Sequence, residues 1–239
     1  MANIGILLLI IVVSSLPAVA AFAWFRLARY PFAARLFLAA LFAGATSPFV
    51  AIALQNFVSF LGIPPPMFGR SGLFAEIFVR IAFTEELARL LLLVPVFLAF
   101  ARFDPEKLSP PGVSEQTMGM ACGFVVGLGF GIFEGAAYGT ADPVNALLRI
   151  VSATPLHAAC GSRIGAAATT FRRQPVQAVF RFLSAVAIHG LYNLLIVTPG
   201  RISPMVAVLA AFLALASSAR TISVGMRGEE TGIGEPPIK

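Results

Sequence analysis

The chain contains the stretch Phe83-Thr84-Glu85-Glu86-Leu87-Ala88-Arg89-Leu90-Leu91-Leu92-Leu93, in which two carboxylates and an arginine interrupt an apolar run. The surrounding residues, about 73–100, otherwise resemble one membrane-spanning helix. A charge at that depth costs about 2.5–3.5 kcal/mol on insertion scales, so such side chains face a partner or a cavity. On a helix, Arg89 lies within reach of both Glu85 and Glu86. One arginine cannot neutralise two carboxylates, and we expect a metal, a proton or a histidine nearby.

The composition predicts an integral membrane protein. The 239-residue chain is 58% hydrophobic and 12% charged, and its mean hydropathy is +0.89. Long apolar runs with so few charges are typical of polytopic helical proteins in the lipid bilayer. The net charge of +6 therefore indicates loop arginines that set membrane orientation, and it does not indicate nucleic-acid binding. Cys122 and Cys160 fall in apolar runs and are expected to be buried and unpaired.

We expect an all-α bundle of about seven spans that forms a single membrane domain over residues 1–239. The approximate ranges are 3–24, 36–61, 73–100, 117–139, 146–171, 177–198 and 203–222. Two alternatives stay open for the fifth span, because Pro155 either begins it or lies inside a longer helix. The residues that suggest chemistry fall within about 73–198.

Basic residues predict that the N-terminus lies outside. With seven spans in that orientation, the inner side holds eleven basic residues, namely Arg26, Arg29, Arg35, Arg102, Lys107, Arg172, Arg173, Arg181, Arg220, Arg227 and Lys239. The outer loops hold three, namely Arg70, Arg149 and Arg201. Because Lys and Arg concentrate on the cytoplasmic side, we expect a multi-pass protein of the cytoplasmic (inner) membrane.

Glycine recurs at every fourth residue of the fourth span, at positions 119, 123, 127, 131, 135 and 139. A stripe of small residues lets a second helix approach closely in a membrane. Gly161 and Gly165 repeat the spacing in the fifth span, which is therefore the expected partner.

Ionisable residues recur deep in the predicted spans. They are Glu85, Glu86, Glu134 and the chain's two histidines, His157 and His189. Counting about 1.5 Å per residue along each helix places them in one layer, in the outer half of the membrane. Intramembrane ionisable residues mark functional sites, so this layer predicts a shared site. Asn193 lies four residues after His189, on the same helical face.

Four short motifs resemble, in order and spacing, those of the PrsW family, within the superfamily of CAAX prenyl proteases and bacterial Abi (CPBP) proteins. They are Glu85-Glu86-Leu87-Ala88-Arg89, Gly129-Phe130-Gly131-Ile132-Phe133-Glu134, His157-Ala158-Ala159-Cys160 and His189-Gly190-Leu191-Tyr192-Asn193. The resemblance implies an intramembrane protease with glutamate and histidine in its site, the founding activity being cleavage of an anti-sigma factor. Arg89 stands where PrsW members usually have lysine.

The expected catalytic set is Glu85, Glu86, Arg89, Glu134, His157, His189 and Asn193. Either Glu85 or Glu86 would be the general base that activates water, while Arg89 orients the other carboxylate. His189 and Asn193 would stabilise the developing oxyanion. The substrate would be a membrane-anchored protein, cut near the extracytoplasmic side.

Metal dependence stays open at this level. Glu134, His157 and His189 would either orient the water or bind Zn²⁺ or another divalent metal, since a catalytic zinc site needs three protein ligands and an open position. Two other functions also stay open. Layers of glutamate and histidine build the proton relays of transporters, and a non-catalytic membrane partner could retain the same fold.

Overall fold

A computed structural model describes residues 4–62, 69–108, 110–139 and 143–227 of the chain. Within these ranges the protein consists of helices joined by short turns and contains no strand. The all-α prediction is therefore confirmed.

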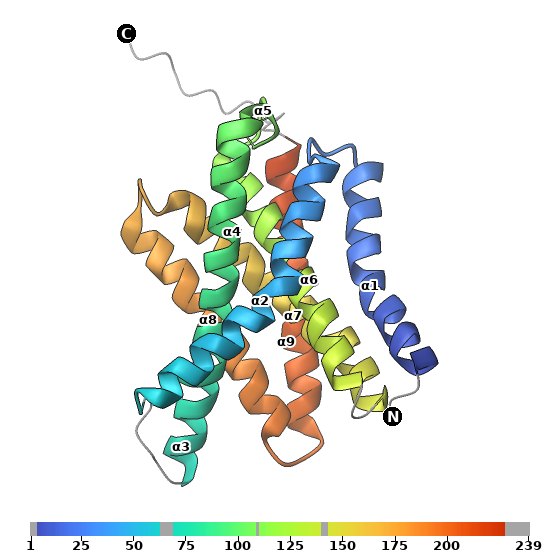
Figure 1. Cartoon of the computed structure of the whole chain (residues 1–239), viewed down its shortest axis with the longest axis vertical. Coiled ribbons are helices and arrows are strands. Elements are labelled where there is room, and N and C mark those ends of the chain that lie inside the picture. Colours follow the sequence, from blue (N-terminus) through green and yellow to red (C-terminus); the bar gives the residue numbers. More distant parts are fainter. Residues whose placement is uncertain (1–3, 63–68, 109, 140–142, 228–239) are drawn as a thin grey trace.

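The long helices correspond one by one to the predicted spans. In chain order the elements are α1 (Ile4–Leu27), α2 (Ala34–Phe60), α3 (Gly69–Ala75), the π-helix η1 (Glu76–Phe83), α4 (Thr84–Phe103), α5 (Pro105–Leu108), α6 (Glu115–Gly139), α7 (Pro143–Thr170), α8 (Pro175–Val197) and α9 (Ile202–Met226). The consecutive elements α3, η1 and α4 form one pass through the bundle, and successive passes alternate in direction (Figure 1).

Five helical segments in the described part of the chain are long and apolar enough to cross a membrane. They are Leu8–Leu27, Ala34–Phe60, Glu115–Ala137, Pro175–Val197 and Ile202–Met226. Helices α4 and α7, which carry several of the predicted site residues, are not among these five. A helical membrane bundle fits this pattern, and the count of seven spans remains a prediction.

Helices α6 and α7 pack together more extensively than any other pair of described elements. A Cβ atom built on Gly123 would overlap the carbonyl oxygen of Gly161, and one on Gly165 would overlap that of Gly119. Only glycine permits this backbone approach. The expected partnership of the two glycine stripes is confirmed. It also reaches the predicted site, because Gly127 lies against the backbone of His157.

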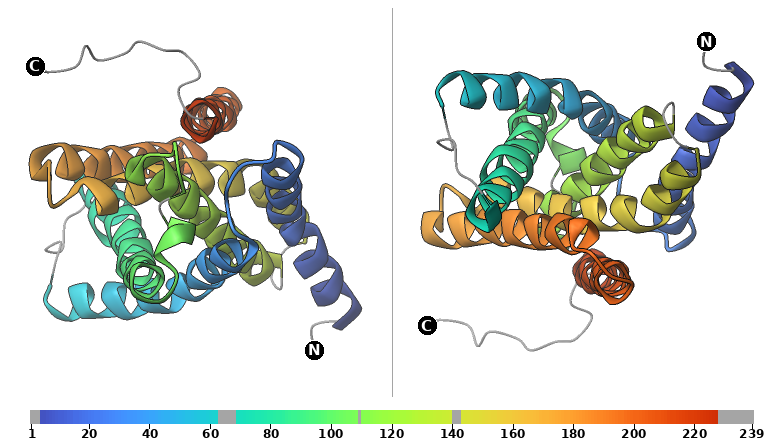
Figure 2. Two further views of the ribbon diagram at one scale, coloured as in Figure 1. Left: turned by 90° about the horizontal axis from the view of Figure 1, so that it is seen from above. Right: turned by 90° about the horizontal axis from the view of Figure 1, so that it is seen from below.

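The other helices surround this central pair. Helix α2 packs on α6 and α4, and α8 packs on α7. Helices α1 and α9 lie at the periphery of the bundle (Figure 2), where α1 contacts α6 and α9 contacts α7 and α8. Helix α4 therefore lies between α2 and α7, with its charged residues facing the centre of the bundle.

Helix α7 shows where the fifth predicted span begins and corrects the predicted location of Arg149. It is continuous from Pro143 to Thr170, so Pro155 lies inside a longer helix. Neighbouring helices can satisfy the backbone groups that an internal proline frees. Arg149, expected in an outer loop, lies instead in this helix and is partly buried. The outer loops then retain Arg70 and Arg201, so the predicted orientation is unchanged.

The π-helix η1 was not expected from the sequence. It places Phe78 against α8, where a Cβ on Gly190 would overlap the Phe78 ring. At its end, the Thr84 hydroxyl donates to the carbonyl oxygen of Arg80 over 2.5 Å. Such widened turns occur frequently at functional sites, and this one directly precedes Glu85 and Glu86.

Candidate active site

Four helices contribute to one cluster of ionisable side chains. Helix α4 provides Glu85, Glu86 and Arg89, α6 provides Glu134, α7 provides His157, and α8 provides His189. These six side chains form a continuous network of contacts. Asn193 is half-buried one turn after His189 and makes no hydrogen bond to another side chain of the described residues. It is the one predicted site residue outside the network.

The guanidinium of Arg89 lies at the centre of the network and is fully buried. Its Nη2 lies 3.0 Å from Oε1 of Glu86 and 3.7 Å from Oε2 of Glu85. The same nitrogen lies 3.2 Å from Nδ1 of His157 and 3.4 Å from Nδ1 of His189. One nitrogen therefore connects residues from three helices.

Phe130 on α6 supports this arginine. The Arg89 guanidinium carbon lies 4.3 Å from the centre of the Phe130 ring, within the range of a cation–π interaction. The same ring lies 4.7 Å from the imidazole of His157. Sequence reasoning did not assign Phe130 a role, although it precedes Glu134 by four residues and so shares its helical face.

The contacts of His157 fix its hydrogen bonding. A guanidinium only donates hydrogen bonds, so Nδ1 of His157 accepts from Arg89. In neutral His157 the proton then lies on Nε2, which donates to Oε2 of Glu134 over 2.7 Å. His157 therefore links the charge of Arg89 to that of Glu134.

Arg149 completes the surroundings of Glu134. Its guanidinium forms an ion pair with Oε1 of Glu134, while His157 bonds to Oε2. Both oxygens of this carboxylate are thus engaged. Sequence reasoning missed Arg149 because it was assigned to a loop. Glu134 is an acid in an apolar span and therefore needs a cationic partner, and this requirement could have pointed to Arg149.

His189 joins the two carboxylates of α4. Its Nδ1 donates to Oε1 of Glu86 over 2.8 Å, and its Nε2 lies 3.6 Å from Oε2 of Glu85. The second distance is too long for a hydrogen bond. Oε2 of Glu85 is buried and has no hydrogen-bond partner within the described residues. Oε2 of Glu86 also has no hydrogen-bond partner there, but Glu86 is held through its Oε1. Glu85 is therefore the carboxylate of the cluster to which no described residue forms a hydrogen bond.

Charge and exposure describe where the cluster can meet water. Three carboxylates face two guanidinium groups, so the cluster holds one carboxylate in excess. Glu86, Arg89, His157 and His189 are almost completely buried, whereas 13% of the Glu85 side chain and 15% of the Glu134 side chain are exposed. Water would therefore approach the cluster at Glu85 and Glu134.

A helical membrane bundle with buried glutamates and histidines at its centre fits the class of intramembrane proteases. Residues 33–217 match the description "PrsW family intramembrane metalloprotease", and the chain belongs to this family of intramembrane proteases. The match extends from the start of α2 into α9 and so covers more of the chain than the four motifs do. No curated protein and no solved structure matches the chain.

The family description is consistent with a divalent metal, for which the sequence suggested Glu134, His157 and His189. Both ring nitrogens of His157 are engaged, by Glu134 and Arg89, and both oxygens of Glu134 are engaged. Among the described residues, no three His, Cys, Asp or Glu side chains are arranged to hold a metal ion. As arranged, these residues do not fit a zinc site with three ligands. That ligand set stays a prediction.

Proposed function

We propose that the protein hydrolyses a peptide bond in a membrane-anchored protein, at the cluster around Arg89 and within the cytoplasmic membrane. The observation that carries this proposal is the state of Glu85. No described residue hydrogen-bonds to its carboxylate, which lies 3.7 Å from Arg89 and 3.6 Å from His189, and its side chain is partly exposed. The other two carboxylates contact Arg89, Arg149 or a histidine at hydrogen-bonding distance.

Glu85 is the general base of this reaction. It takes a proton from a water molecule while the water oxygen attacks the carbonyl carbon of the substrate, and it then delivers the proton to the leaving amine nitrogen. General-base catalysis contributes about 10²–10⁴-fold to such reactions. Glu86 is less suited to this role, because it is fully buried and held by Arg89 and His189.

His189 and Asn193 stabilise the negative charge that develops on the carbonyl oxygen. Nε2 of His189 lies 3.6 Å from Glu85, on the side of the ring that Glu86 does not engage. The Asn193 amide lies one helical turn further along the same face of α8. Removing one oxyanion donor costs about 10²–10³-fold in rate in a well-studied protease.

Arg89, Glu134 and His157 position the other groups. Arg89 holds Glu86 and His157 through one nitrogen, which also lies 3.4 Å from Nδ1 of His189. Glu134 orients His157 and is itself held by Arg149. In this proposal these three side chains do not react with the substrate. They hold other side chains of the cluster in position.

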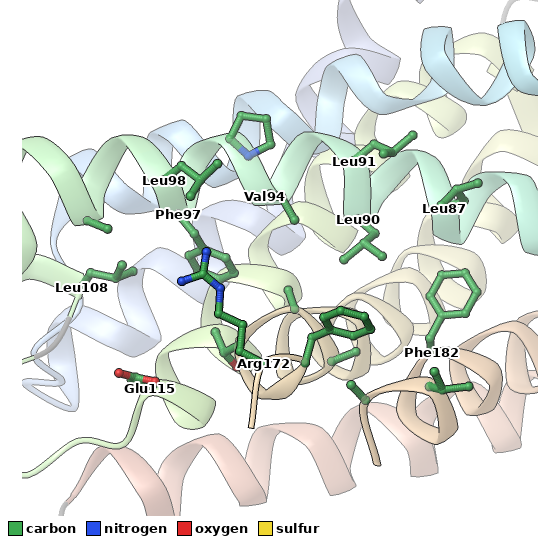
Figure 3. Close-up of a pocket in the computed structure, with 18 of the residues that line it drawn as sticks. Leu87, Leu90, Leu91, Val94, Phe97, Leu98, Leu108, Glu115, Arg172 and Phe182 are labelled. Atoms are coloured by element: carbon green, nitrogen blue, oxygen red, sulfur yellow. The ribbon is translucent and has the colours of Figure 1, made fainter. Parts of the chain in front are cut away.

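The alternative of a proton relay is less well supported. A relay needs polar groups that continue from the cluster toward both membrane faces. Between α4 and α8, however, the space beyond the cluster is lined by Leu87, Leu90, Val94 and Phe182, as Figure 3 shows. The polar side chains that line this space are Glu115, Thr169 and Arg172, near its far end.

A cleavage assay in proteoliposomes tests the proposal. Purified wild-type protein is reconstituted with a panel of single-span proteins, beside the variants Glu85→Gln and Glu76→Gln. Glu76 is the matched control, because it is an acid on the same pass that pairs with Arg80 outside the cluster. We expect wild type and Glu76→Gln to cleave and Glu85→Gln to lose activity. Equal cleavage by wild type and Glu85→Gln would overturn the proposal.

The same assay tests metal dependence. Because Glu134 and His157 are already engaged by each other and by arginines, we expect cleavage to continue unchanged after dialysis against a chelator. Loss of activity on dialysis, restored by Zn²⁺ but not by buffer alone, would instead support the ligand set predicted from the sequence.

A further inference from the structure

A long groove lies between α4 and the pair formed by the end of α7 and the start of α8. It encloses about 850 Å³. Leu87, Leu91, Val94 and Leu98 line it along α4, and Figure 3 shows this stretch of α4 across the space from Phe182 and Arg172. We call this space the α4–α8 groove. Its wall on the α4 side extends from Phe83, the last residue of η1, to Ala101 of α4, which at 1.5 Å per residue is about 27 Å.

The groove is open to the membrane along its side. Leu91, Val94 and Leu98 are 47%, 38% and 59% exposed in the bundle. The opposite wall carries small residues, including Ala168 and Ala178, so the space between the helices is not filled by side chains. A hydrocarbon chain can therefore enter from the bilayer and lie along α4.

One end of the groove carries an unmatched positive charge. Arg172 and Glu115 line this end, where α4 finishes and α6 begins. Glu115 lies 3.5 Å from Arg173, so its charge has a partner. Arg172 makes no ion pair or hydrogen bond within the described residues, and Figure 3 shows its guanidinium reaching across the groove toward α4.

We propose that the α4–α8 groove binds an anionic phospholipid, with its acyl chains along α4 and its phosphate at Arg172. Basic pockets between membrane helices on the cytoplasmic side bind anionic headgroups in this way. With the predicted orientation, Arg172 lies at the cytoplasmic leaflet, which is the anionic one. An apolar channel with a cation at one end matches a lipid, which is apolar with an anion at one end.

A substrate helix fits the groove less well. At the other end of the groove the rings of Phe83 and Phe182 meet edge to face, with centroids 5.5 Å apart. Both rings line the groove, so their contact takes up space at that end. In addition, a cytoplasmic flank rich in Lys and Arg, as membrane spans usually have, would meet the positive charge of Arg172.

The bound lipid would stabilise the site. Helix α4 contacts α8 far less extensively than it contacts α2. The contacts across this seam include Phe83 with Phe182 and Glu86 with His189. A lipid that fills the space beside these contacts holds α4 and α8 at a fixed separation, so lipid binding should raise the melting temperature.

Native mass spectrometry and thermal melting of the full chain in detergent test the proposal. The probes are phosphatidylglycerol and phosphatidylcholine with identical acyl chains. The variants are Arg172→Gln, Leu98→Trp to fill the groove, and Arg102→Gln as a control. Arg102 lies at the same end of α4, is exposed and does not line the groove. Circular dichroism verifies that each variant keeps its helix content.

We expect wild type to retain phosphatidylglycerol in preference to phosphatidylcholine and to melt at a higher temperature with it. Arg172→Gln should lose about fivefold in affinity for phosphatidylglycerol alone, the scale for one basic residue at a membrane surface. Leu98→Trp should lose both lipids, and Arg102→Gln should behave as wild type. Equal retention of the two lipids by wild type, or equal behaviour of Arg172→Gln and Arg102→Gln, would overturn the proposal. So would a photo-crosslinker at Val94 that captures a single-span protein in preference to lipid.

Discussion

Oε1 of Glu86 on α4 and Nδ1 of His189 on α8 lie 2.8 Å apart, although 103 residues separate them in the chain. Both side chains are almost completely buried. Because α4 and α8 otherwise contact each other little, this bond joins two parts of the bundle as well as two parts of the candidate site. Glu86 therefore has a structural task that Glu85 does not share.

Stability measurements should separate the two adjacent glutamates. Removing one partner of a buried ion pair costs about 3–5 kcal/mol, because the other charge stays buried and unpaired. We expect Glu86→Gln to lower both the melting temperature and the cleavage rate. Glu85→Gln should abolish cleavage with little change in melting temperature, since its carboxylate lies 3.6 Å or more from Arg89 and His189 and forms no hydrogen bond within the described residues. Thermal melting by circular dichroism checks this, and the opposite ranking would mean that the two roles are exchanged.

Arg89 should tolerate lysine better than a neutral residue. All its contacts to Glu85, Glu86, His157 and His189 that the described residues show pass through one nitrogen, Nη2. A lysine supplies one charged nitrogen, although it lacks the flat guanidinium that lies over Phe130. We expect Arg89→Lys to keep a measurable part of the activity and Arg89→Gln to keep none. Similar losses in both variants would show that the planar group matters more than the charge.

Arg149 should act on the reaction through Glu134. Without its guanidinium, Oε1 of Glu134 loses its partner, and the carboxylate is free to turn away from His157. We expect Arg149→Gln to lower the cleavage rate about a hundredfold, the scale for a misplaced catalytic group. Arg149→Lys should restore part of it.

The control for Arg149 is Arg201→Gln. Arg201 is exposed and lies just before α9, so removing its charge should leave cleavage unchanged. An Arg149→Gln variant that cleaves at the rate of this control would show that Glu134 does not need the ion pair.

The sequence predicted the parts of this structure that follow from the properties of the membrane. Intramembrane charges need partners, and this requirement was enough to place Glu85, Glu86, Glu134 and both histidines in one layer. The glycine spacing predicted the pairing of α6 with α7 because backbone approach depends on small residues alone.

Other features depended on information that the sequence pattern does not carry. The π-helix Glu76–Phe83 has no residue signature that distinguishes it from an α-helix. Phe130 is one apolar residue among many, and its contact with Arg89 arises only when α4 and α6 meet. Arg149 was misplaced because Pro155 left the start of the fifth helix undecided.

Cysteine labelling tests the predicted orientation. The native residues Cys122 and Cys160 are buried, so they should not react with impermeant reagents. Arg201 and Gln174 are exposed and directly precede α9 and α8, respectively. In intact cells we expect Arg201→Cys to be labelled and Gln174→Cys to be protected. Reversed labelling would place the N-terminus inside and the candidate site in the inner half of the membrane.

The position of the cut bond tests the central claim most directly. Mass spectrometry of labelled N-termini would compare membrane proteins from cells that express wild type, Glu85→Gln or Glu76→Gln. We expect new N-termini with wild type and Glu76→Gln, located at or just outside the extracytoplasmic end of a membrane span, and none of them with Glu85→Gln. The same N-termini in cells with Glu85→Gln, or cut sites on the cytoplasmic flank, would contradict the proposal that Glu85 activates water for peptide hydrolysis in the outer half of the membrane.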